Sequence, residues 1–318
     1  MSAQHNSTDQ LAHPGSRHLS PSARPLTPAL ARGDRIEVVA NLASGSVGPD
    51  APAQLAAIFE EYGLTANIRA SAPADLIADL KAAIAAGPRL LIVLAGDGTA
   101  RAAAELCGAE GPLLAPLPGG TMNFLPHAIY GAKPWPQALR LALESGEVRM
   151  LGGGRLAGHR FLCAAVLGTA ALWAPAREAI RKGRLDLAFS RALTALRRTF
   201  ESRLRYVIDA GRLDKARAVI VMCPVASKVM TEDDSALEAV ALNFQHAGEA
   251  LKLGSSLLIG DWRDDPLVEN RPCQSIQVRS SRPIPAILDG ETVLLGSKTE
   301  IHYEPAVIRV LAPPRSAK

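Results

Sequence analysis

Apolar residues in the first half of the chain follow two alternating patterns. Short β-rich runs, typical of strands, occur at residues 35–40, 64–69 and 90–94. Between them, apolar residues recur at helical spacing in residues 51–61 and 73–86. Strands that alternate with helices in this order predict a parallel sheet covered by helices.

The pattern changes after Met150. Short β-rich segments separated by turn residues predict a second, antiparallel domain. These segments are residues 160–166, 216–223, 239–243, 275–279, 286–288, 292–295 and 299–303. Residues 175–206 carry an apolar stripe at helical spacing and are expected to be mostly helical. The expected fold class is therefore α/β, with an N-terminal parallel-sheet domain followed by a β-rich antiparallel domain.

Composition narrows the class of protein. With 318 residues, 48% hydrophobic and 21% charged, the chain is expected to be a soluble globular protein with room for two domains. Only 4% of the residues are aromatic, which disfavours a nucleic-acid surface built on base stacking. The four cysteines lie far apart in the sequence, which indicates reduced thiols in a cytoplasmic protein. The seven histidines lack the spacing of metal ligands. Residues 1–33 lack apolar periodicity and a secretory-type apolar region, and are expected to form a disordered tail.

The most informative stretch follows the apolar run at residues 90–94. The sequence Ala95-Gly96-Asp97-Gly98-Thr99 predicts a tight turn that leads into a helix. Glycines allow backbone N–H groups to approach a ligand, and a helix start adds free N–H groups and a positive dipole end, an arrangement that suits a phosphate. A carboxylate repels a bare phosphate, so Asp97 makes sense beside Mg²⁺ or a hydroxyl that loses its proton. Taken alone, the motif could equally be a turn after a buried strand.

A second glycine loop strengthens the phosphate-site interpretation. Residues 112–121 again lead an apolar strand into a glycine pair, followed by Thr121, Asn123 and a predicted helix. Loops from adjacent parallel strands meet at the carboxyl edge of the sheet, where ligands of open α/β folds bind.

Four motifs taken together resemble the diacylglycerol kinase catalytic-domain family, which includes sphingosine kinases and bacterial lipid kinases. They are Asn41 with Ser44-Gly45, the AGDGT turn, the PLPGGTMN loop, and Leu288-Asp289-Gly290-Glu291 before the segment from Pro305 to Pro313. The resemblance covers about residues 34–313. It implies a nucleotide-binding domain at 34–148, to which 305–318 return, and a β-rich lipid-substrate domain at 149–304.

The resemblance also implies a site in the cleft between these domains. ATP would be bound by residues of the first three motifs, namely Asn41, Ser44, Gly45, Gly96, Gly98, Thr99, Gly119, Gly120, Thr121 and Asn123. Asp97 would bind the Mg²⁺ ion that accompanies ATP. The catalytic acids would be Asp97, Asp289 and Glu291. Phosphoryl transfer needs such a set of N–H donors, Mg²⁺ and a carboxylate, but which acid is the base stays open. Asp289-Gly290 is also a strong β-hairpin signal in its own right.

Three positions depart from the family pattern. Ala95 replaces the first glycine of GGDGT, and Phe124 stands where an aspartate often follows the asparagine. Ser235 replaces a glycine in an acidic turn at residues 232–237 that supports a structural Mg²⁺ in some members. A solvated acidic turn is therefore favoured there over a metal site.

The expected function is that of an ATP- and Mg²⁺-dependent lipid kinase acting on a hydroxyl of a diacylglycerol-like or sphingoid-like lipid. An NAD-kinase-like enzyme and a catalytically silent lipid-binding regulatory protein are the alternatives. Residues 177–205 carry nine basic and three acidic residues, an excess larger than the net charge of +4 of the whole chain. This segment predicts a cytoplasmic enzyme that is peripheral at the anionic inner membrane surface. No nucleic-acid partner is expected, and the oligomeric state, with a homodimer among the options, is left open.

Overall fold

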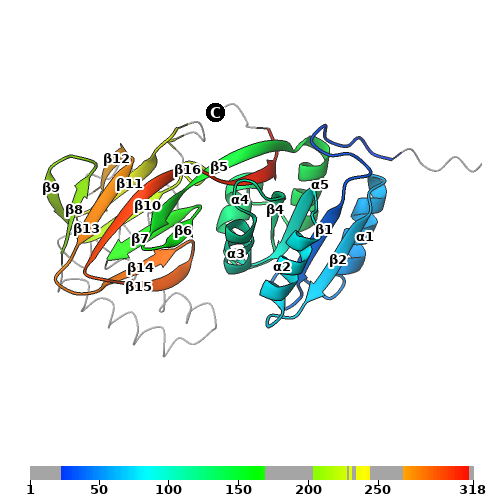
Figure 1. The fold of residues 1–318 in the computed structure, drawn as a ribbon, viewed down its shortest axis with the longest axis horizontal. Helices are drawn as coiled ribbons and strands as arrows, with labels where there is room; N and C mark the ends of the chain where they lie inside the picture. The colour runs from blue at the N-terminus through cyan, green and yellow to red at the C-terminus, as the bar shows by residue number, and fades with distance from the viewer. Residues whose placement is uncertain (1–22, 169–202, 228, 231–233, 244–267, 315–318) are drawn as a thin grey trace, which may run out of the picture.

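The computed structural model describes residues 23–168, 203–227, 229–230, 234–243 and 268–314. A parallel sheet with helices occupies one end of the molecule, and antiparallel strands occupy the other (Figure 1). The expected α/β fold class, with a parallel-sheet N-terminal part and a separate antiparallel sheet, is confirmed.

The parallel part contains four strands in the order β2-β1-β3-β4. They are β1 (Ile36–Asn41), β2 (Ala66–Ser71), β3 (Leu90–Ala95) and β4 (Leu113–Pro118). The helices are α1 (Ala51–Glu61), α2 (Leu76–Ala85), α3 (Asp97–Cys107), α4 (Phe124–Tyr130) and α5 (Trp135–Ser145). Strand β3 is buried along its whole length, as its uninterrupted apolar sequence requires.

The helices cover both faces of this sheet. The chain moves outward from β1 to β2 and then back across β1 to β3, so right-handed crossovers place α1 and α2 on opposite faces. Consistently, α1 packs against α5, and α2 packs against α3. This arrangement leaves the carboxyl ends of β1, β3 and β4 as the edge from which the loops project.

Two long strands connect the two ends of the molecule. Strand β5 (Glu147–Leu156) pairs antiparallel with β16 (Lys298–Ala312) along most of its length, and β16 also pairs with β4 at Val310 (Figure 1). The last residues of β16 pack in the core of the parallel part. We propose to divide the chain accordingly at residues 148 and 304, with the residues from 305 onward counted with the first domain.

The antiparallel end is built from two layers. One layer continues the first sheet beyond β16 through β13 (Ser275–Arg279), β8 (Leu204–Ile208) and β9 (Leu213–Ala216). The other is a separate sheet in the order β12-β11-β10-β7-β14-β15. Its strands are β7 (Ala164–Gly168), β10 (Ala218–Met222), β11 (Leu237–Leu242), β12 (Val268–Cys273), β14 (Ile284–Leu288) and β15 (Glu291–Leu295). Alternating apolar residues of the two layers, such as Val278 and Val221, share one core.

Several expected elements need correction. The strand expected at 160–166 is two strands, β6 (His159–Phe161) and β7, because the backbone between them turns to bind Asp289. The helix expected at 175–206 is wrong at its end, where Leu204–Ile208 form β8; residues 175–202 lie outside the described part of the chain. Strand β5 was not expected, because its three consecutive glycines are unusual in a strand. A Cβ at Gly154 would lie 2.1 Å from the ring of Phe161, so β5 needs a glycine there.

The expectation of a disordered tail over residues 1–33 is wrong for residues 23–33. Thr27 and Leu30 are buried, and the backbone of Thr27 donates to Leu143 O at 2.8 Å. Arg24 pairs with Glu144 at 3.1 Å. This segment therefore packs over α1 and α5. Of the expected tail, residues 1–22 lie outside the described part of the chain. Proline content misled the prediction, because a proline-rich segment can still be held by a few buried side chains.

None of the helices that the structure describes is both long enough and apolar enough to cross a bilayer.

Removing the side chain of Leu30 tests the packing of this segment. Leu30 is 7% exposed in the core of the parallel part, so Leu30→Ala should lower the free energy of unfolding by about 2 kcal/mol. Leu294→Ala, at a leucine that is 72% exposed, is the matched control and should change little. Denaturant unfolding measures both variants, and equal effects would show that residues 23–33 are not part of the fold.

Candidate active site between the two sheets

Three loops from the parallel sheet meet at its carboxyl edge. They follow β1, β3 and β4, which are neighbouring strands in the order β1-β3-β4. Because parallel strands end at the same edge, the register places Ala95 of β3 beside Pro118 of β4. The loops that were predicted from the sequence to lie together are therefore adjacent.

Glycines allow the second and third loops to touch through their backbones. A Cβ on Gly120 would lie 2.7 Å from the Cα of Gly96, and a Cβ on Gly119 would lie 2.7 Å from the backbone N of Ala95. Neither gap admits a side chain. The two loops are thus in backbone contact. The N–H groups of Gly119 and Gly120 are bonded to Ala95 O and to Asn123, so the N–H groups that this contact leaves for a phosphate are those at the start of α3.

The first loop packs on the third. Ser46 donates its backbone N–H to Gly119 O and its hydroxyl to Gly120 O, both at 3.0 Å. A Cβ on Gly45 would lie 3.8 Å from Oγ1 of Thr121, so these two residues are neighbours. Within the loop, Asn41 accepts the N–H of Ala43 at 3.0 Å and fixes the turn in which Ser44 lies. Ser46 is not among the residues predicted from the sequence, although it follows directly after Ser44-Gly45.

Asn123 has a structural task in this site. Its backbone is left-handed, with φ of 53°, and its side chain is buried. The amide accepts the N–H of Gly120 at 2.7 Å and donates to the carbonyl of the same residue at 3.0 Å. Asn123 therefore shapes the glycine loop, while a direct contact of this residue with ATP stays a prediction.

Asp97 is the first residue of α3, directly after Gly96. Burial raises the pKa of its carboxyl, and nearby N–H groups of α4 and of Asn123, together with His127, act in the opposite direction. Its Oδ1 atom is buried and has no hydrogen-bond partner among the described residues. An unpartnered buried carboxylate oxygen is costly, and a cation at this point would remove the cost.

The turn at Asp289-Gly290 brings the second sheet to these loops. Leu288 pairs with Glu291, and both turn residues have positive φ, 46° and 92°, which makes a two-residue hairpin turn between β14 and β15. The hairpin reading of this motif is therefore right in local geometry. Its tip nevertheless reaches the first domain, since a Cβ on Gly290 would lie 3.3 Å from the ring of Phe124.

The carboxylate of Asp289 is used within its own domain. It accepts the backbone N–H groups of Leu162, Cys163 and Ala164 at 2.6, 2.8 and 2.9 Å. Burial raises the pKa of Asp289, and these three bonds oppose the rise. The residue was expected as a catalytic acid. Its geometry shows it holding the break between β6 and β7, with both oxygens already bonded.

Glu291 lies directly over the start of α3. A Cβ on Gly98 would lie 2.4 Å from Oε1 of Glu291, so the glycine makes room for this carboxylate. Arg101 forms an ion pair with Glu291 across the two domains. The Glu291 side chain is 45% exposed to solvent. The charges of Asp289 and Asp97 also act on the buried thiol of Cys163, adding to the effect of burial in raising its pKa. The three predicted acids therefore lie in one region.

Arg101 and His127 were not foreseen. Arg101 stands four residues after Asp97 on α3, and His127 stands four residues after Asn123, spacings that place each pair on one helix face. That spacing is the signal that could have found them.

For a metal, the described residues offer a limited donor set. They contain no group of three or more His, Cys, Asp or Glu side chains arranged to hold an ion. A single carboxylate with an orphaned oxygen, as at Asp97, fits Mg²⁺ that is bound mainly by nucleotide phosphates. Residues 231–233, which belong to the acidic turn where the sequence disfavours a structural metal site, lie outside the described part of the chain.

Known proteins resemble this chain in sequence over part of its length and in fold over most of it. Residues 35–151 match the model of the diacylglycerol kinase catalytic domain. A diacylglycerol kinase structure from Bacillus anthracis str. Sterne superposes with a TM-score of 0.63 at 18% identity, covering 88% of this chain and 97% of that one. Two further structures from that organism give TM-scores of 0.66 and 0.67.

A yeast NADH kinase in complex with NADH gives a TM-score of 0.51 at 11% identity, covering 92% of this chain and 85% of that one. No curated protein matches the chain. At these identities the solved structures show a shared fold. The motif-based resemblance to the diacylglycerol kinase catalytic-domain family is therefore confirmed, by sequence over residues 35–151 and by fold over most of the chain.

Proposed function

We propose that the protein is an ATP- and Mg²⁺-dependent kinase that phosphorylates a hydroxyl of a diacylglycerol-like or sphingoid-like lipid. The observation that carries the proposal is the position of Glu291, which comes from the second sheet and lies over Gly98 at the start of α3. A carboxylate from one domain thus faces a phosphate-type loop of the other, as transfer from a nucleotide to a second substrate requires.

Glu291 is the best candidate for the general base. It is the most accessible of the three acids, and the ion pair with Arg101 orients its carboxylate toward the loop. Asp289 is a poor candidate, because its oxygens are occupied by three backbone N–H groups. As the hydroxyl oxygen bonds to the γ-phosphorus and the bond to the bridging oxygen breaks, the hydroxyl proton would pass to Glu291.

The nucleotide would be bound by the three loops at the carboxyl edge. Backbone N–H groups at Gly96 and Gly98 would be the donors for its phosphates, and Asp97 would hold the metal. The N–H of Gly120 is already bonded to Asn123, so this residue would shape the site instead. When bound, Mg²⁺ neutralises the charge of the triphosphate and orients it. The Asp97 oxygen left without a partner is the feature of this chain that fits such an ion.

The rival activity is that of an NAD-kinase-like enzyme. The yeast NADH kinase shares the fold over most of the chain, so this alternative concerns the acceptor alone. The Ser44-Gly45 loop and the Glu291 hairpin favour the lipid acceptor. We further propose that the enzyme is cytoplasmic and meets its lipid at the anionic inner membrane surface, because basic residues are concentrated between Arg177 and Arg205.

The function is tested by incubating the protein with labelled ATP, Mg²⁺ and a panel of acceptors that contains diacylglycerols, sphingoid bases and NAD. Label should pass to one of the lipids. Transfer to NAD alone would establish the rival activity, and no transfer to any acceptor, despite ATP binding, would favour a silent lipid-binding protein.

In the same assay, Glu291→Gln should lower turnover by roughly 100-fold or more, because the amide cannot accept the hydroxyl proton. Glu60→Gln is the control, since Glu60 is an exposed acid of α1 away from the site. A folded Glu291→Gln variant with the turnover of the control would remove Glu291 from the mechanism.

Asp289→Asn is expected to affect the fold before the chemistry. The amide would turn an N–H donor toward backbone N–H groups, so the free energy of unfolding should fall by about 2 kcal/mol or more. Asp214→Asn breaks an exposed ion pair with Arg212 and should cost no more than about 1 kcal/mol. Should Asp289→Asn keep wild-type stability and lose turnover, Asp289 acts in the chemistry after all.

A further inference from the structure

Four basic residues form a row across the sheet, at the end away from the loops. The register places Lys298 of β16 opposite Arg279 of β13, Arg279 opposite Arg205 of β8, and Arg205 opposite Lys215 of β9. Directly opposed residues point to the same face, and all four side chains are exposed. With strands about 4.8 Å apart, the row spans about 14 Å. We refer to these four residues as the basic row.

The basic row is unfavourable for the isolated protein. Like charges directly opposite one another destabilise a sheet. Among the described residues, no carboxylate forms an ion pair with any member of the row, and Arg279 has only a hydrogen bond to Gln277 at 3.5 Å. Elsewhere in the described chain, arginines at comparable positions are paired, for example Arg155 and Arg160 with Glu304. The row therefore lacks the internal neutralisation seen in other parts of the surface.

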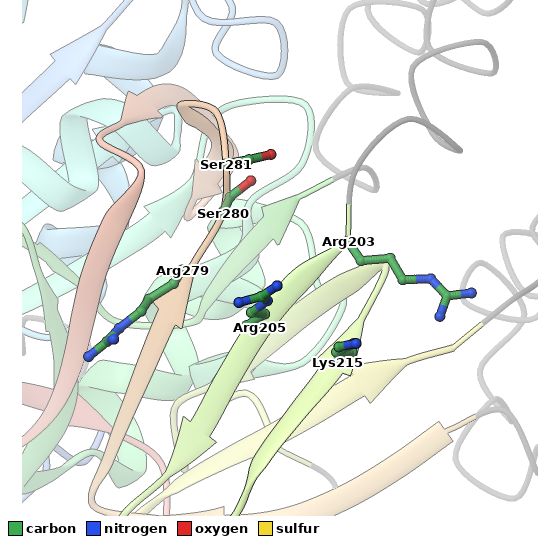
Figure 2. Close-up of a pocket in the computed structure, with 6 residues that line it drawn as sticks. All are labelled: Arg203, Arg205, Lys215, Arg279, Ser280 and Ser281. Atoms are coloured by element: carbon green, nitrogen blue, oxygen red, sulfur yellow. The ribbon is translucent and has the colours of Figure 1, made fainter.

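A hollow of about 380 Å³ lies over this row. It is lined by Arg203, Arg205, Lys215, Arg279, Ser280 and Ser281. Figure 2 shows the side chains of Arg205 and Lys215 on neighbouring strands, between that of Arg279 on one side and that of Arg203 on the other. The lining thus contains four cations and two hydroxyl groups, and no acid. Phosphate oxygens accept hydrogen bonds from guanidinium, ammonium and hydroxyl groups, and the lining offers all three kinds of donor.

The charge of Arg203, in the lining of the hollow, also acts on a neighbouring arginine. The pKa of Arg217, between β9 and β10, is lowered by burial and further by the charge of Arg203. An anion in the hollow would relieve this repulsion.

The hollow is separate from the active site. Strands β13, β8 and β9 lie at the opposite end of the sheet order from β2-β1-β3-β4, and Figure 1 shows them far from α3 and α4. The positive strip is also narrow, because the next residues on the same face include Glu300 of β16 and Val207 of β8. A narrow strip suits individual phosphate groups better than a nucleic-acid duplex, whose charges spread over a wide surface.

We propose that the basic row and its hollow form a second anion site, which binds a phosphate ester outside the active site. The ester belongs either to the headgroup of an anionic phospholipid or to a soluble phosphorylated compound. The inference rests on the row itself and holds whether or not the protein is a lipid kinase.

The test compares Arg205→Gln/Arg279→Gln with the control Lys81→Gln/Lys133→Gln, which removes two exposed charges from the first domain. Binding to phosphatidylcholine vesicles with and without phosphatidylglycerol measures the lipid source. The rise in melting temperature with added inorganic phosphate, relative to chloride at equal ionic strength, measures the soluble source. A third variant, Arg205→Lys/Arg279→Lys, keeps the charges.

If the ester is a lipid headgroup, the row variant should bind phosphatidylglycerol vesicles about 30-fold more weakly than the control variant, because each basic residue near an anionic surface contributes about fivefold in affinity. If the ester is soluble, the phosphate-dependent rise in melting temperature should be clearly smaller in the row variant than in the control, in which both the row and the glycine loops can bind phosphate. The lysine variant should retain most of either effect.

Equal behaviour of the row variant and the control with both probes would overturn the proposal. So would a row variant that loses affinity for a DNA duplex alone, since the surface would then bind nucleic acid. Neither readout uses kinase turnover, so failure of the proposed function leaves this test intact. Removal of like charges should leave the melting temperature in chloride unchanged or higher, which shows that the row variant is folded.

Discussion

Backbone contact between Gly96 and Gly120 is the constraint on which the site depends. Parallel pairing of β3 with β4 brings these two residues together, and a single added Cβ on Gly120 would meet the Gly96 backbone at 2.7 Å. Because the loops touch, the start of α3 and the third loop share one edge, and Ser46 can close the first loop over them. Sheet register thus determines which loop residues touch, and this contact places the third loop against the N–H groups at the start of α3.

The second sheet reaches the site through the tip of one hairpin, where two acidic residues have different tasks. Asp289 faces backward and secures the backbone at residues 162–164, while Glu291, two residues later, faces forward over Gly98. Three hydrogen bonds from backbone N–H groups to the buried Asp289 carboxylate hold the turn in place within its own domain. The fixed turn positions the neighbouring Glu291, and the ion pair with Arg101 links the tip to α3. The same four-residue motif is therefore both a hairpin turn and a part of the active-site region.

Much of the first domain could be predicted from the sequence, because periodicity reports strands and helices directly and the glycine motifs mark where the strands end. The tasks of Asp289 and Asn123 could not be predicted, since they depend on which distant backbone groups the side chains meet. Strand β5 could not be predicted, because its glycines make room for the rings of Phe161 and Tyr303, contacts that exist only in the folded chain. The basic row could not be predicted either, because its members come from four separate segments and only the strand register places them side by side.

If close backbone contact of the glycine loops creates the nucleotide site, as we propose, ATP affinity should depend on the missing side chain of Gly120. Equilibrium binding of ATP to Gly120→Ala in the presence of Mg²⁺ measures this dependence. Gly48→Ala is the matched control, because a Cβ at Gly48 meets nothing within 4 Å. We expect Gly120→Ala to remain folded and to lose at least about tenfold in ATP affinity, or about 1.4 kcal/mol, while Gly48→Ala binds as the wild type does. ATP affinity of Gly120→Ala equal to that of the wild type would contradict this proposal.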